Sequence, residues 1–131
     1  MGDLQYFVER DRKNEEKLKE RLAALPSYCQ DYFRGIAPST TTMTRLAYAY
    51  DLVMFFNYLS EHSITISSDP LYQTDPDVLK QITQQDIERF LEYLSGKTDS
   101  SDSGPKNQTQ GIRRRLSALN SFFGYFYRAG I

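Results

Sequence analysis

The sequence has few of the residues on which disulfide bonds and metal sites depend. Among its 131 residues there is one cysteine and one histidine. Because Cys29 has no partner for an internal disulfide bond, the composition favours a reducing compartment such as the cytoplasm. His62 is alone, whereas a metal site needs several ligands at suitable spacing. We therefore expect a cytoplasmic protein with no metal and no cofactor.

Long apolar runs and the signatures of common enzymes are also absent from the sequence. No apolar run approaches the roughly 20 residues that cross a bilayer, and the N-terminus is charged from Asp3 onward, unlike a signal peptide. The sequence has neither the G-x-S-x-G pattern of hydrolases nor the glycine pattern of dinucleotide-binding folds. We expect no membrane association, no small-molecule substrate and no catalytic residues in this chain.

Apolar residues are plentiful enough for one packed domain. They make up 40% of the chain, and a chain of this length buries about two-thirds of its unfolded surface. They recur every three or four positions, which predicts helices over residues 3–25, 26–35, 42–61, 84–94 and 113–131. The predicted fold is all-α, a compact bundle of four to five helices in residues 26–131. Residues 1–25 form an extra, highly charged N-terminal helix.

Residues typical of helix boundaries support these ranges. Pro26 ends the first helix, Gly35 provides a stop for the second, and Thr83 with Asp86 resembles a capping box. Residues 60–82 form a long connection, interrupted by one short helical turn at residues 76–81. Residues 95–103 are predicted to be a polar, flexible loop.

The last helix has two different faces. The predicted apolar face carries Ile112, Leu116, Leu119, Phe123 and Phe126, and the predicted polar face carries Arg113, Arg114, Ser117 and Ser121. Arg115 lies beside the apolar face, so we expect it to bury its stem and pair with an acid. Cys29 lies among aromatic residues and is predicted to be a small buried apolar residue.

Charge is distributed unevenly along the chain, although the net charge is −1. Residues 104–131 contain five basic residues and no acid, whereas residues 61–103 contain nine acids and three bases. One end of the fold is therefore cationic, which suits a body with a single DNA-facing side.

The start of the helix at residues 42–61 offers a second cationic feature. Hydroxyl side chains from Ser39 to Thr42 precede Arg45, and no acid occurs between Asp31 and Asp51. Backbone N–H groups at a helix start, together with hydroxyls and a cation, can bind phosphate. The same hydroxyls also suit simple capping of the helix, and the sequence leaves both interpretations open.

Three segments, in this order, resemble a known family. The first has Thr44, Tyr48, Asp51-Leu52 and an aromatic end, the second has Ile82 to Ile87 followed by Phe90, Leu91 and Leu94, and the third has Arg114-Arg115-Leu116-Ser117-Ala118-Leu119 followed by Ser121-Phe122-Phe123. Together they resemble the core-binding domain of tyrosine recombinases, the phage integrase family, over residues 26–131. The resemblance implies that this domain forms half of a clamp around double-stranded DNA, in DNA integration or recombination.

The resemblance also implies which residues contact DNA and which part of the family is missing. The implied DNA-binding residues are Thr42, Thr44, Arg45, Lys106, Asn107, Gln108, Arg113, Arg114 and Ser117, with Arg113 and Ser117 as groove contacts and Arg114 as a phosphate contact. Gly111 departs from the threonine or serine usual in the family, and we expect a late helix start there. The family's catalytic domain follows the core-binding domain, so we expect this chain to be a fragment that binds DNA without cleaving it, and full-length protomers to assemble with one another.

Two other functions remain open at this point. The basic last helix and the charged segment 3–25 also suit a helical protein-protein interaction module. A small stand-alone DNA-binding regulator would carry the same basic helix.

Overall fold

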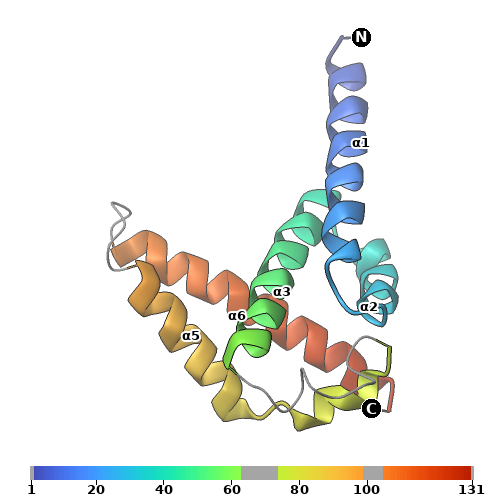
Figure 1. The fold of residues 1–131 in the computed structure, drawn as a ribbon. Coiled ribbons are helices and arrows are strands. Elements are labelled where there is room, and N and C mark those ends of the chain that lie inside the picture. The colour runs from blue at the N-terminus through green and yellow to red at the C-terminus, as the bar shows by residue number, and fades with distance from the viewer. Residues whose placement is uncertain (1, 63–73, 99–104, 131) are drawn as a thin grey trace.

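The computed structural model describes residues 2–62, 74–98 and 105–130, and all regular secondary structure in these ranges is helical (Figure 1). The elements are α1 (Gly2–Ala23), α2 (Cys29–Ile36), the 3₁₀ helix η1 (Ala37–Ser39), α3 (Thr42–His62), the 3₁₀ helix η2 (Pro76–Gln81), α5 (Gln84–Thr98) and α6 (Pro105–Arg128). The all-α prediction is confirmed.

Helix starts follow the capping residues of the sequence. Thr41 caps α3, since its Oγ1 accepts a hydrogen bond of 3.1 Å from the backbone N–H of Thr44. Thr83 and Asp86 form a capping box, in which each side chain accepts a bond from the other residue's backbone N–H, at 3.1 and 2.9 Å. Asp75 caps η2 through its Oδ1, which accepts a hydrogen bond of 2.9 Å from the backbone N–H of Asp77, so the predicted short turn is also present.

The helices cross around α3 and α6, which meet in the middle of the molecule (Figure 1). α2 and α5 both contact α6, and the C-terminal part of α1 packs against α3. The rest of α1 extends away from the body (Figure 1). Among the described side chains of α1, Asn14 is the first that is buried, so the preceding part forms an arm, called here the α1 arm.

Aromatic rings fill the space between the crossing helices. Tyr32, Phe55, Phe90 and Phe122 are among the largest fully buried side chains. Their rings meet edge to face, with centroids 5.2 Å apart both for Tyr32 and Phe122 and for Phe55 and Phe90. Each such pair contributes about 1 kcal/mol beyond its buried area. Cys29 is fully buried among them, as predicted.

The predicted start of α6 and the predicted end of α5 are wrong. α6 begins at Pro105 and not near residue 113, because proline is well suited to the first helical position and Gly111 does not interrupt the helix. α5 continues to Thr98, and the Ser95 hydroxyl donates to the carbonyl of Leu91, at 3.1 Å. The predicted loop at residues 95–103 is therefore helical up to residue 98. Its remainder, and residues 63–73 of the connection at 60–82, lie outside the described residues.

The buried face of α6 is rotated relative to the prediction. Leu116 is 38% exposed and lines an open hollow of about 610 Å³ between α5 and α6, whereas Phe122 is completely buried. Ser121, predicted on the polar face, is half-buried and accepts a hydrogen bond of 2.7 Å from the Tyr32 hydroxyl. The cause is that α6 contacts α2, α3 and α5 at once, so its buried face is set by three neighbours.

Gly35 does not end α2 as predicted, since the helix continues to Ile36 and then into η1. Its role is close packing. A Cβ at this position would lie 2.6 Å from Cε2 of Tyr125 on α6, so glycine leaves room for this ring against α2.

Candidate nucleic-acid interface

The polar face of α6 presents Arg113 and Ser117 to solvent. Both residues are exposed and lie four positions apart, so their side chains project from the same side of the helix. Arg113 forms no ion pair with any residue that the structure describes, so its guanidinium is available to a ligand. Lys106, Asn107 and Gln108 belong to the first turns of the same helix, and their side chains lie outside the described part.

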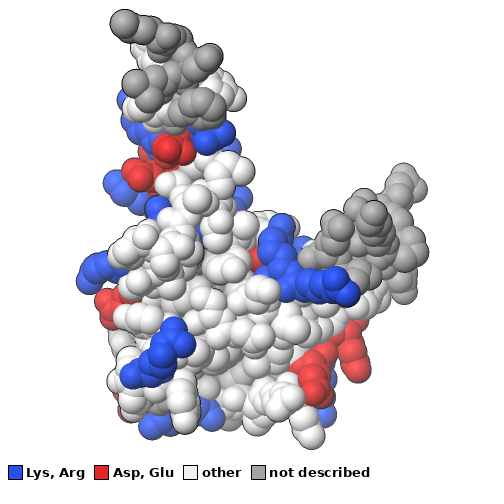
Figure 2. All heavy atoms as spheres, turned by 180° about the vertical axis from the view of Figure 1, so that it is seen from behind, with Lys and Arg blue, Asp and Glu red and all other residues white. Residues whose placement is uncertain are grey.

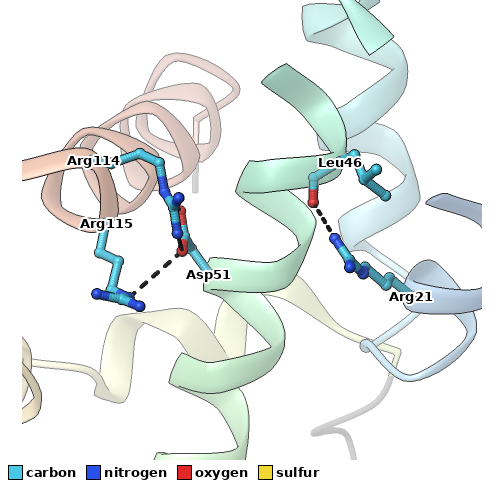
Figure 3. A network of polar contacts seen from close by, with 5 residues as sticks. All are labelled: Arg21, Leu46, Asp51, Arg114 and Arg115. Atoms are coloured by element: carbon cyan, nitrogen blue, oxygen red, sulfur yellow. Dashed lines mark hydrogen bonds and ion pairs between the residues drawn. The ribbon is translucent and has the colours of Figure 1, made fainter. Parts of the chain in front are cut away.

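A buried carboxylate joins α3 to α6 (Figure 3). Asp51 of α3 has a fully buried side chain and accepts two hydrogen bonds from Arg114, from Nη2 to Oδ1 at 2.8 Å and from Nε to Oδ2 at 3.1 Å. Arg115 forms a second ion pair with the same carboxylate, with Nε 3.6 Å from Oδ1 and a side chain only 16% exposed. The predicted pairing of Arg115 with an acid is confirmed. The bidentate pair of Arg114 was not predicted.

The charges in this cluster affect one another. Burial raises the pKa of Asp51, and the hydrogen bond and charge of Arg114, followed by the charges of Arg115 and Arg21, oppose that rise. The hydrogen bond to Asp51 raises the pKa of Arg114, so this guanidinium stays charged. The Arg114 side chain is 45% exposed, and its Nη1 has no hydrogen-bond partner among the described residues. Arg114 is thus fixed at one edge and open at the other.

The first turn of α3 uses its predicted phosphate-binding groups internally. The Arg45 guanidinium donates from Nη1 to the carbonyls of Ala37 and Thr40, at 3.0 and 2.7 Å, and from Nη2 to Oγ1 of Thr42 at 3.2 Å. The Thr44 hydroxyl lies 3.0 Å from that of Thr41. These contacts are those of helix capping, and they tie α3 to the end of η1. Phosphate contact by Thr42, Thr44 and Arg45 stays a prediction.

The pair between Asp51 and Arg114 fixes where α6 crosses α3. Asp51 is nine residues beyond Thr42, roughly 13 Å along α3, so the pair with Arg114 holds α6 against the N-terminal half of α3. In Figure 2, which shows the molecule from behind, a group of Lys and Arg side chains lies near the middle of the body, and others lie along α1.

Tyr50 and Arg21 belong to the same region, although sequence reasoning missed both. Tyr50 is 43% exposed and is close enough to contribute to the raised pKa of Arg114. The Arg21 guanidinium of α1 lies over its ring, with Cζ 5.3 Å from the ring centroid, and donates to the carbonyl of Leu46 at 2.8 Å. A hint was present in the sequence, since Tyr50 directly precedes the acid of the Asp-Leu pair.

Other kinds of site are not found in the described part of the chain. Residues 2–62, 74–98 and 105–130 contain no group of three metal-ligating side chains. No helix in the same ranges has the length and apolar character needed to cross a membrane.

Comparison with known proteins gives a consistent result. Residues 28–130 match the family described as "Phage integrase, N-terminal SAM-like domain". The chain is 32% identical over 115 residues to tyrosine recombinase XerS of Streptococcus uberis, and the match covers 84% of this chain and 32% of that protein. It is 30% identical over 118 residues to XerS of Lactococcus lactis subsp. lactis, covering 86% and 32% of the two chains.

A third relative is tyrosine recombinase XerC of Caldanaerobacter subterraneus, which is 27% identical over 88 residues, 63% of this chain and 23% of that protein. The chain thus spans about a third or less of the length of these relatives. No solved structure matches it significantly.

Proposed function

The chain belongs to the phage integrase N-terminal SAM-like domain family, the N-terminal domain of tyrosine recombinases, and we propose that it grips duplex DNA at a recombination site. The observation that carries the proposal is the exposed, cationic side of α6, which Asp51 holds against the N-terminal half of α3. Because a rigid surface loses little entropy on binding, cations fixed in this way favour association with a regular array of phosphates.

Each residue of this surface has a distinct proposed role. Arg113 and Ser117 project from the middle of α6 and reach the edges of bases in the major groove. Arg114 binds phosphate through its open edge while Asp51 orients the guanidinium. Thr42, Thr44 and Arg45 at the start of α3, and Lys106, Asn107 and Gln108 at the start of α6, lie close to the DNA backbone.

The proposal assigns this chain to binding and not to cleavage. The tyrosine recombinases that it resembles are about three times as long as the matched segment. We propose that the catalytic residues belong to a further domain of the full-length protein, whose protomers assemble on the site. A single domain forms only part of the grip, so its own affinity should be in the range of non-specific binders, roughly 10⁻⁴ to 10⁻⁶ M at physiological salt.

A salt titration of duplex binding tests this function. Fluorescence anisotropy with a short duplex of mixed sequence should show log K falling linearly with log salt concentration, because phosphate contacts release counterions. Arg113→Gln should weaken binding. If this arginine also contacts a phosphate, the variant should reduce the slope of log K against log salt concentration by about one. Arg89→Gln replaces an exposed arginine of α5, outside the proposed surface; it is the matched control and should bind as the wild type does. Salt-independent binding, or equal loss in both variants, would refute the proposal.

A further inference from the structure

The orientation of α1 is fixed by its buried side. Asn14 and Leu18 are each 9% exposed and lie four residues apart, on the side of α1 that packs against α3. Apart from these two residues, every described side chain of α1 from Gln5 to Glu20 is exposed. α1 lies outside residues 28–130, the part of the chain that matches the family.

One exposed flank of α1 carries four basic residues in a row, called here the basic stripe. Arg10, Lys13, Lys17 and Arg21 are spaced by three or four residues, so they fall within about 80° of the helix circumference. Between Arg10 and Arg21 no acid falls within that sector. Lys13 and Lys17 are exposed, and neither forms an ion pair with a residue that the structure describes.

The basic stripe leads directly into the surface already described. Its last member, Arg21, donates to the carbonyl of Leu46 and lies over the ring of Tyr50 on α3. Tyr50 directly precedes Asp51, which accepts both hydrogen bonds from Arg114 of α6. Figure 3 shows Arg21 on one side of α3 and Arg114 on the other, with Asp51 between them. Arg21 of α1 and Arg114 of α6 thus both contact the stretch of α3 around Tyr50 and Asp51.

We propose that the basic stripe of α1 binds the phosphate backbone of the same duplex, next to the segment contacted by α6. From Arg10 to Arg21 the stripe extends for roughly 16 Å, the length of about five base pairs. The α1 arm projects from the body (Figure 1), so the stripe adds to the footprint of the domain without displacing α3 or α6. This inference rests on the proposed function, because it needs DNA on the α6 side.

The test compares two double variants with equal changes of charge. Lys13→Gln with Lys17→Gln removes two charges from the basic stripe, and Arg12→Gln with Lys19→Gln removes two from the opposite flank of the same helix. All four residues are exposed, so neither variant should lose stability or helix content. In the anisotropy titration, the stripe variant should reduce the slope of log K against log salt by about two. The control variant should change this slope by about one or less.

The outcomes separate the inference from the function on which it rests. If the stripe variant and the control variant bind equally well, while Arg113→Gln still weakens binding, the inference is wrong and the proposed function stands. If the wild type shows no salt-dependent binding, both are wrong. If duplex binding is unchanged but sedimentation shows that only the wild type and the control self-associate, the stripe is a protein-docking surface and the inference is overturned.

Discussion

Replacing Arg114 by alanine should destabilise the domain, although the side chain is half exposed. The change leaves Asp51, whose side chain is fully buried, without its bidentate partner. Removing one member of a buried ion pair costs about 3–5 kcal/mol, because the remaining charge keeps its desolvation penalty. Water already reaches Arg114, and Arg115 remains 3.6 Å from Oδ1, so both reduce the loss. We expect a decrease of about 2–3 kcal/mol in the free energy of unfolding.

Arg113 provides the matched comparison one position away. It is an exposed arginine on the same helix with no ion pair among the described residues, so Arg113→Ala should change stability by about 0.5 kcal/mol or less. Arg114→Lys keeps the charge but loses the planar, two-bond geometry. Its loss of stability should lie between those of Arg113→Ala and Arg114→Ala. The comparison bears on DNA binding as well, because weak binding by Arg114→Ala reflects both a lost contact and a loosened α3–α6 junction.

Urea denaturation followed by far-UV circular dichroism measures these differences, with the slope m as a check that the unfolded state is unchanged. A double-mutant cycle with Asp51→Ala isolates the pair. Once Asp51 is absent, Arg114→Ala should cost little, giving a coupling energy of about 2 kcal/mol. A coupling energy near zero, or equal stability of the Arg113→Ala and Arg114→Ala variants, would refute the role assigned to the buried carboxylate.

Three further predictions concern the core. Burial raises the pKa of Tyr32 to about 12 from the usual 10, so the free energy of unfolding should fall as the pH rises from 10 towards 12. Tyr32→Phe should show a smaller fall over this pH range. At neutral pH this variant should be about 1 kcal/mol less stable than the wild type, because it lacks the hydrogen bond to Ser121. Gly35→Ala should destabilise the fold by about 1–3 kcal/mol in thermal unfolding, because its Cβ would lie 2.6 Å from the Tyr125 ring, and a Tyr125→Ala background should remove that cost. Cys29 is fully buried and its pKa is raised by burial, so a thiol reagent should modify it only at the rate of global opening; rapid modification of the native protein would contradict this packing.

The fold was largely predictable from the sequence, because local signals and packing agreed. Helical spacing of apolar residues, the break at Pro26 and the capping box at Thr83 and Asp86 all correspond to features of the structure. The start of α6 was misplaced because Gly111 suggested a weak helix, whereas the helix begins at Pro105. Helix propensity is a weak signal, and tertiary packing overrides it.

The candidate site was harder to predict, because side-chain partners depend on how helices cross. The sequence placed Arg113, Arg114 and Ser117 on one polar face, but it gave no sign that Arg114 would meet Asp51, 63 positions away. The contact of Arg21 of α1 with α3 was equally unpredictable, because the residues of α1 alone do not determine the angle at which it packs. Arg115 was predicted correctly because its position beside the apolar face restricts it to a buried partner.

The most direct test of the central claim, that the α6 side of the domain binds duplex DNA, is an NMR titration of the labelled chain with a short duplex. Amide signals should shift most around Arg113 to Ser117 in α6 and from Thr42 to Tyr50 in α3, while the signals of α5 stay in place. Shifts concentrated on the exposed face of α5, around Glu88 and Glu92, or no shifts at low salt, would contradict the claim.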